Sequence, residues 1–124
     1  MGEFAQHTPL CPRIERLAQI VLDYVLAAGD VVVLDVGCEY SGYAADVTRT
    51  LPASGKFSPR QREIYEIVLG ARNAVLAAIK PGMTLGRGGE NSLQKIAYDY
   101  INSHGKDRHG DSLGKYFLHT VGHH

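Results

Sequence analysis

The chain has 124 residues, and its 13 Lys and Arg balance 13 Asp and Glu, so the formal net charge is zero. That length suits one domain, and the balanced charge lacks the basic field that nucleic acids and anionic membranes attract, so we expect neither as a partner. Two isolated cysteines, Cys11 and Cys38, and an opening without a signal-peptide layout indicate a cytoplasmic protein.

The first predicted element is an amphipathic helix over residues 12–28. Pro12 opens it, and Gly29 follows as a stop signal. Apolar residues recur at intervals of three and four, as one buried helix face requires. They are Ile14, Leu17, Val21, Leu22, Val25 and Leu26.

Two strand-like runs follow, over residues 31–35 and 43–51, with the turn "GCEYSG" between them. The first run is apolar and β-branched, and the second alternates valine and threonine with other residues. We therefore predict an antiparallel β-hairpin, with Cys38 in its turn as a small buried side chain.

Two amphipathic helices are predicted next. The first follows Ser58 and Pro59, with Gln61 completing a capping box and Pro81 ending the helix. Its expected buried stripe is Ile64, Ile67, Val68, Ala71, Val75 and Ile79. The second helix is expected over residues 90–103, and its expected buried residues are Leu93, Ile96, Ala97, Tyr100 and Ile101. The glycine-rich residues 86–89 suit a loop. The run "YFLHTV", residues 116–121, is strand-like, so the fold class predicted is α+β.

Asp35 and Asp46 interrupt the apolar pattern of the two hairpin strands. Their spacing predicts roughly opposite positions, where Cβ atoms on one face lie about 4.5–5.5 Å apart. Two half-buried carboxylates that close need a shared proton, an arginine such as Arg49, or a divalent cation between them. The Asp-Thr/Ser-Gly turn of a proton-sharing dyad is absent from the sequence. The cation is the best chemical explanation.

The histidines near residue 124 strengthen the metal hypothesis. His119, His123 and His124 add imidazole to the carboxylates, a mixture that manganese, cobalt, zinc and iron accept. His119 and His123 stand four apart, as in the helical HExxH zinc motif, but Thr120 replaces the glutamate and the intervening "TVG" is poor helix material. We therefore do not predict a zincin helix.

The stretch "LDVGCEYSGYAADVTRTLPASGKFSPRQREIYEIVL" followed by "FLHTVGHH" closely resembles the catalytic domain of Xaa-Pro aminopeptidases. These are pita-bread metallopeptidases of family M24, and they are related to prolidase. The resemblance covers about residues 29–124, so we expect a partial pita-bread domain there and a divergent segment with one helix over residues 1–28.

The resemblance also implies roles for single residues. Asp35 matches the first metal-binding aspartate, Asp46 the aspartate that bridges two ions, and His123 the single histidine ligand. His119 matches a histidine that lines the substrate pocket. Thr48 matches a hydroxyl that steadies the metal ligands. The implied cofactors are two divalent ions, with manganese favoured over cobalt, zinc and iron.

The implied activity is removal of the N-terminal residue from peptides whose second residue is proline. The family's two later glutamates, one of which shuttles protons, are not among these 124 residues. We therefore assign no catalytic residue and expect the fragment to be inactive alone. Xaa-Pro dipeptidase (prolidase), a non-catalytic peptide-binding module and a truncated product without function remain alternatives. The resemblance also allows a homo-oligomer in the full-length form.

Overall fold

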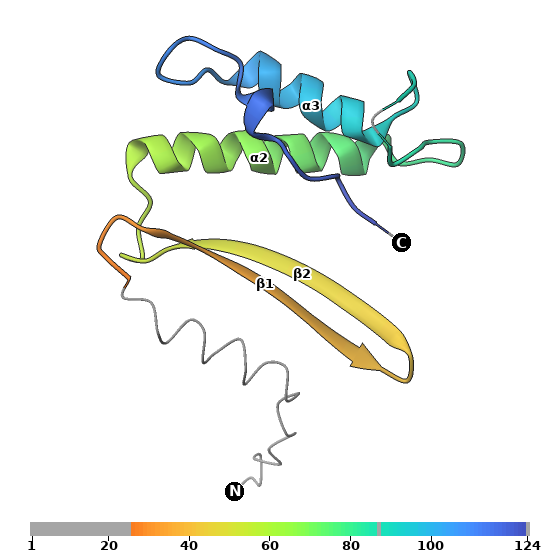
Figure 1. Cartoon of the computed structure of the whole chain (residues 1–124), viewed down its shortest axis with the longest axis horizontal. Helices are drawn as coiled ribbons and strands as arrows, with labels where there is room; N and C mark the ends of the chain where they lie inside the picture. The colour runs from red at the N-terminus through yellow and green to blue at the C-terminus, as the bar shows by residue number, and fades with distance from the viewer. Residues whose placement is uncertain (1–25, 87, 124) are drawn as a thin grey trace, which may run out of the picture. The chain divides into compact units, whose positions relative to one another are not determined.

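The computed structural model describes residues 26–86 and 88–123, which form two compact units (Figure 1). The hairpin unit ends at Phe57, and the helical unit begins at Ser58. The helix predicted over residues 12–28 lies outside the described residues except for its last three. Those three are loop and turn, because the Asp30 carboxylate accepts a hydrogen bond from the Ala27 amide at 2.9 Å and the Asp30 amide bonds back to the Ala27 carbonyl.

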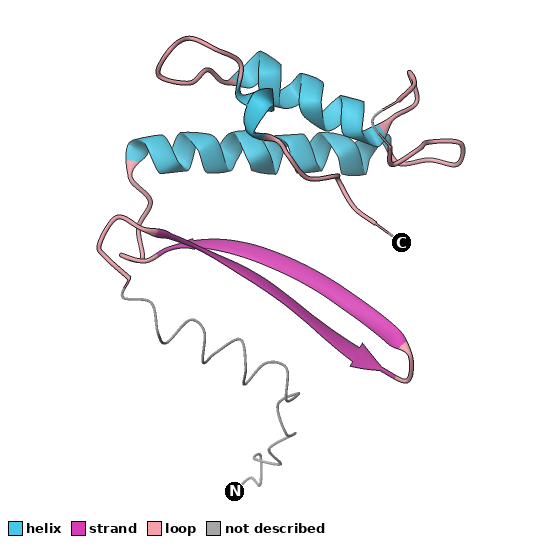
Figure 2. Cartoon of the chain, viewed as in Figure 1, coloured by secondary structure: helices cyan, strands magenta, loops and turns pink. Residues whose placement is uncertain are grey.

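The predicted β-hairpin is confirmed, and its strands are longer than expected. Strand β1 spans Val31–Tyr40 and pairs antiparallel with β2, Tyr43–Pro52 (Figure 2). Ser41 and Gly42 form the turn with φ angles of 52° and 83°. Positive φ at both turn residues is the hallmark of a type I′ turn, whose twist matches that of the paired strands. Pairing therefore continues to the turn, and Cys38 lies in β1 with an exposed side chain, contrary to prediction.

The helical unit contains two helices that pack against each other, α2 over Pro59–Ala78 and α3 over Leu93–His104. The predicted capping box of α2 is present: Ser58 Oγ accepts from the Gln61 amide, and Gln61 Oε1 accepts from the Ser58 amide. Helix α3 begins three residues later than predicted, because the Ser92 hydroxyl caps it by accepting from the Lys95 amide at 3.1 Å. The described residues of the loop predicted over 86–89 (residues 86, 88 and 89) lie outside any helix or strand, as expected.

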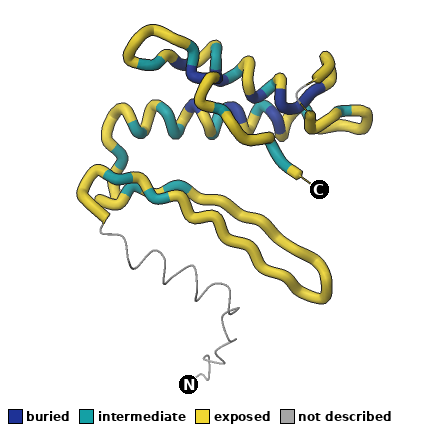
Figure 3. The backbone as a smooth tube through the Cα atoms, in the orientation of Figure 1, coloured by how far each residue is buried: buried dark blue, intermediate teal, exposed yellow. Residues whose placement is uncertain are grey.

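The core of the helical unit lies where α2 faces α3 (Figure 3). Its buried apolar residues are Ile67, Ala71, Val75, Leu93, Ala97, Ile101 and Leu113. Two members of the predicted α2 stripe are instead exposed, Val68 by 55% and Ile79 by 56%. Val68 lies about 100° around the helix from Ile67, and Ile79 follows the last residue of α2. Contact with α3 therefore buries a narrower stripe than periodicity predicted.

The strand predicted over residues 116–121 is wrong. Leu113–Tyr116 form a short 3₁₀ helix, η1, and residues 117–123, which we call the tail segment, have no regular secondary structure. No strand of the described part of the chain pairs with the tail segment. Its backbone is instead hydrogen-bonded by the side chain of Gln94 in α3. Within the described residues, no helix is both long and apolar enough to cross a bilayer.

Candidate metal site and substrate-site residues

The hairpin register places both predicted metal-binding aspartates on one face of the sheet. Asp35 pairs with Thr48, and Gly37 pairs with Asp46. Paired residues share a face, and so do residues two apart on one strand. Asp35 and Asp46 are therefore diagonal neighbours rather than the opposite partners predicted, and diagonal neighbours lie farther apart than the about 4.5–5.5 Å between Cβ atoms of opposite residues.

Thr48 contacts Asp35 directly. Its Oγ1 donates a hydrogen bond to Asp35 Oδ1 at 3.0 Å. A hydroxyl that donates to one carboxylate oxygen fixes the rotamer of the acid and leaves the other oxygen for a second partner. The neighbouring hydroxyl expected from the resemblance is therefore in place beside Asp35.

Arg49 is not well placed to neutralise the two acids. It pairs with Leu34, so strand alternation puts it on the face opposite Asp35 and Asp46. Its Nη1 donates to the Thr48 carbonyl at 2.8 Å. The arginine alternative is therefore disfavoured by the register, and Arg49 supports the backbone of β2.

Gly37 keeps the space opposite Asp46 open. A Cβ at residue 37 would lie 2.7 Å from the Ala45 carbonyl oxygen, closer than side-chain carbons approach. Residue 37, which pairs with Asp46, therefore has to lack a side chain. The two carboxylates on this face offer hard oxygen ligands, the donors that manganese, magnesium and calcium prefer.

The two predicted site histidines, His119 and His123, lie in the tail segment of the helical unit. Gln94 of α3 holds this segment with both ends of its carboxamide. Its Nε2 donates to the His119 carbonyl at 2.9 Å, and its Oε1 accepts from the Val121 amide at 2.8 Å. Gln94 is only 3% exposed, so these bonds lie in a protected environment.

An open pocket of about 440 Å³ lies beside Gln94 in the helical unit. Its lining residues are Gln94, Lys95, Tyr98, Gly114, Lys115, Phe117 and Leu118. His119 is not among them, so the substrate-pocket role of His119 stays a prediction. Across the described residues, no three His, Cys, Asp or Glu side chains gather as a metal site. The assignment of Asp35, Asp46 and His123 as metal ligands also stays a prediction.

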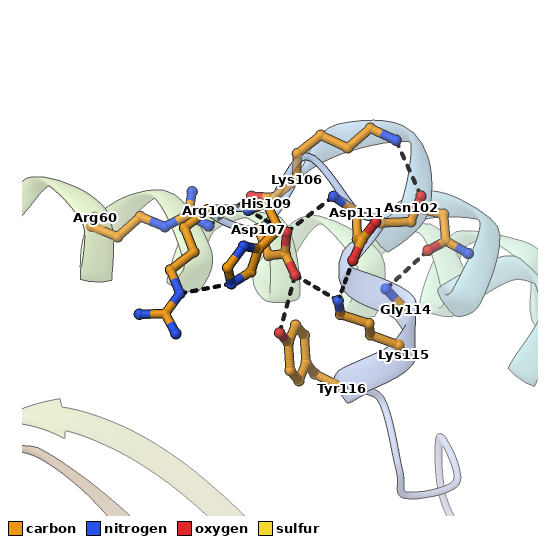
Figure 4. Close-up of polar contacts among 11 residues, drawn as sticks. Arg60, Asn102, Lys106, Asp107, Arg108, His109, Asp111, Gly114, Lys115 and Tyr116 are labelled. Carbon is orange, nitrogen blue, oxygen red and sulfur yellow. Dashed lines mark hydrogen bonds and ion pairs between the residues drawn. The ribbon is translucent and has the colours of Figure 1, made fainter.

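A second polar cluster surrounds Asp107 in the loop between α3 and η1 (Figure 4). The side chain of Asp107 is 7% exposed and lies 2.6 Å from Lys115 Nζ. It also accepts from the His109 and Asp111 amides and from the Tyr116 hydroxyl. The Lys115 ammonium and the backbone amides hold the pKa of Asp107 well below its usual range. Asp107 and Asp111 in turn raise the pKa of Lys115. Because the donors around Asp107 come from its own loop and from η1, the cluster ties this loop to η1.

Sequence patterns gave no prediction for Gln94 or Asp107. Gln94 could have been noticed, because it stands three residues before Ala97 and seven before Ile101, within the apolar stripe of α3. A polar residue in such a stripe needs a buried partner. Asp107 lies in a polar run of six charged or histidine residues among nine, and nothing in that run distinguishes it from a solvated loop residue.

Comparison with known proteins shows the family. The model of metallopeptidase family M24 matches residues 12–124. The chain belongs to this family, and its α+β hairpin and helices are part of a pita-bread domain. The class and partial fold predicted from sequence are therefore confirmed.

Individual relatives are similar to parts of the chain. The Xaa-Pro aminopeptidase of Escherichia coli is 53% identical over 57 residues, which cover 46% of this chain and 13% of the relative. The Xaa-Pro dipeptidase of Pyrococcus furiosus is 39% identical over 104 residues, which cover 84% of this chain and 26% of the relative. A solved structure of a histidine-to-alanine variant of E. coli aminopeptidase P matches with a TM-score of 0.49 and 40% identity, over 60% of this chain and 15% of that one. The chain thus spans about an eighth to a quarter of these curated relatives.

Proposed function

We propose that this chain is the metal-binding part of a metal-dependent Xaa-Pro aminopeptidase. The observation that carries the proposal is the placement of Asp35 and Asp46 on one face of the hairpin, in a chain of family M24. Two carboxylates on one face of a sheet supply the oxygen ligands that divalent cations bind. Two divalent ions, with manganese first, are the proposed cofactors.

In this proposal each residue of the chain has a limited task. Asp35 and Asp46 hold the ions through oxygen, and His123 adds one nitrogen. Thr48 keeps Asp35 in one rotamer through the 3.0 Å hydrogen bond. His119 contacts the peptide substrate, whose second residue is proline. Paired divalent ions supply an activated water at neutral pH and polarise the scissile carbonyl.

The 124 residues contain three of the five ligands that the resemblance implies, and not the glutamate that shuttles protons. When catalytic groups act as a unit, the absence of some of them lowers the activity by far more than their share of the total number. We therefore expect residues 1–124 alone to bind ions weakly and to be inactive on peptides.

Xaa-Pro dipeptidase activity is the second candidate. The match to the Pyrococcus relative covers 84% of the chain, compared with 46% for the E. coli aminopeptidase. The aminopeptidase match is more identical, 53% compared with 39%, and this higher identity is why we place aminopeptidase first.

The experiment compares the 124-residue chain with the product of the same reading frame continued past codon 124. Both are assayed with manganese on an Xaa-Pro dipeptide and on a tripeptide with proline second. Cleavage of the tripeptide by the longer product alone supports the proposal. Cleavage of only the dipeptide supports the dipeptidase. Cleavage by the 124-residue chain, or by neither product although the frame encodes the two glutamates, would contradict the account.

A further inference from the structure

The tail segment that carries both predicted site histidines has no strand to hold it within the described residues. Near His119 its backbone is hydrogen-bonded by Gln94, the second residue of α3. The carboxamide bonds the carbonyl of His119 and the amide of Val121 at 2.9 and 2.8 Å. It therefore satisfies the backbone on both sides of Thr120, as a neighbouring strand would.

Together these two hydrogen bonds fix the orientation of a backbone segment and not only the position of one atom. A carboxamide is planar, so a donor and an acceptor engaged together set the orientation of the backbone between residues 119 and 121. The direction in which the His119 side chain leaves the backbone follows from that orientation. His123 comes two residues after Val121, so its Cα position also depends on the held backbone.

A second carboxamide of α3 holds the chain farther from the histidines. Asn102 Oδ1 accepts from the Gly114 amide at 2.9 Å, at the start of η1. Gln94 and Asn102 are eight residues apart, about two turns along α3 and about 80° around it. The helix thus holds residues 114–121 at two points, and only the Gln94 point adjoins His119.

We propose that Gln94 is a positioning residue, which fixes the backbone of His119–Val121 and so aims the His119 imidazole and places His123 for metal binding. The inference rests on the proposed function for the roles of the two histidines. The contact itself does not depend on a metal. Gln94 touches neither substrate nor ion in this proposal and acts through the backbone that it holds.

The test uses NMR of the 124-residue chain without added metal, and compares wild type with Gln94→Leu, Gln94→Glu and Asn102→Leu. Gln94→Leu removes the donor and the acceptor while keeping apolar bulk. Gln94→Glu keeps the acceptor for Val121 and, when ionised, loses the donor to His119. Asn102→Leu is the matched control, because it removes the other α3 carboxamide that bonds the backbone of residues 114–121.

In Gln94→Leu we expect the Val121 amide to exchange at least about tenfold faster, and the His119 and His123 ring signals to shift. The core amides of Ala97 and Ile101 should keep their exchange rates. Gln94→Glu should restore most of the Val121 protection while the His119 signals remain shifted. Asn102→Leu should speed exchange at Gly114 and leave Val121 and the histidine rings unchanged.

Unchanged Val121 exchange in Gln94→Leu would overturn the inference. So would equal acceleration at Val121 and Ala97, which indicates general destabilisation, or ring shifts of the same size in Asn102→Leu. A second measurement adds Mn²⁺: broadening of the His123 ring should weaken in Gln94→Leu and persist in Asn102→Leu. If wild type shows no such broadening, the metal role of His123 fails, and the metal-free exchange data still decide whether Gln94 holds the segment.

Discussion

Asp35 and Asp46 share one face of the hairpin as diagonal neighbours, because Asp35 pairs with Thr48 and Gly37 pairs with Asp46. The offset of two residues along the strand separates these acids more widely than directly opposed side chains are separated. A Cβ at Gly37 would lie 2.7 Å from the Ala45 carbonyl oxygen, so the close pairing opposite Asp46 requires a glycine. The relationship suits two oxygen ligands around a cation better than two acids in direct contact.

Removing either carboxylate should weaken binding of manganese to the 124-residue chain. We expect wild type to bind with a Kd of about 0.1–1 mM, the range of weak carboxylate sites, and Asp46→Asn and Asp35→Asn to raise the Kd at least about tenfold, about 1.4 kcal/mol. Glu63→Gln is the control, because Glu63 forms an exposed ion pair with Arg60 on α2. Titration calorimetry measures all four. An equal Kd in wild type and both aspartate variants would argue against these ligands.

Thr48→Val should loosen Asp35 without removing a ligand. Its hydroxyl bond to Asp35 is lost, while the β-branched shape that suits a strand is kept. Loss of one hydrogen bond should destabilise the hairpin by about 0.5–1.5 kcal/mol. Manganese affinity should fall about tenfold, the lower end of the effect of hydrogen-bond partners of metal ligands. Thr48→Ser keeps the hydroxyl, so its affinity should stay near wild type; equal losses in both variants would exclude the hydroxyl as the cause.

The Asp107 cluster predicts the acid sensitivity of the helical unit. The pKa of Asp107 is lowered in the folded chain, chiefly by Lys115, so its stabilising effect is complete above the unfolded pKa of about 3.9 and is lost as pH falls below it. The pKa of Lys115 is raised, so the contribution of Lys115 to folding stability is complete below about pH 10.4 and is lost as pH rises above it. The melting temperature measured against pH should therefore show both contributions in full between about pH 5 and pH 9.

Asp107→Asn separates this cluster from other acids. The variant should melt lower than wild type at pH 7, and the difference should shrink as pH falls below about 4, because the Asp107 carboxyl of the unfolded wild-type chain then takes up a proton while the folded one stays ionised. Asp99→Asn, which breaks the exposed pair with Lys95, is the control and should change the melting temperature little. A constant difference between Asp107→Asn and wild type at every pH would contradict the assigned cause.

Two neighbouring residues of α2 test the narrow buried stripe. Ile67 is 8% exposed and Val68 is 55% exposed. Ile67→Ala should lower the free energy of unfolding by about 2–5 kcal/mol, because it removes buried methylene groups and leaves a cavity. Val68→Ala should change it by no more than about 0.5 kcal/mol. Urea denaturation of both variants measures the difference, and equal losses would show that Val68 is buried in solution.

The features predicted correctly depend on local sequence. Ser58 and Gln61 lie three residues apart, so the start of α2 follows from a bond pattern contained in four residues. The hairpin follows likewise from two β-branched runs around a serine and a glycine that tolerate positive φ. Asp35 and Asp46 stood out because they break an apolar pattern, and their role as metal ligands stays a prediction.

The features predicted wrongly depend on distant partners. Residues 116–121 have strand-like composition, but a strand needs a neighbour, and here the carboxamide of Gln94 bonds the backbone instead. Val68 has the right periodicity for the core, yet its burial depends on which part of α2 meets α3. The diagonal offset of the two aspartates depends on the turn, because a two-residue turn fixes the register of every later pair.

The most direct test of the account is an NMR titration of the 124-residue chain with manganese, which broadens signals near the bound ion. At substoichiometric Mn²⁺ we predict selective broadening of the amides of Asp35, Gly37, Asp46 and Thr48, and its loss in Asp46→Asn. Broadening centred on Asp107 and Asp111, or spread evenly over the acidic residues, would contradict the claim that the hairpin acids form the cation site.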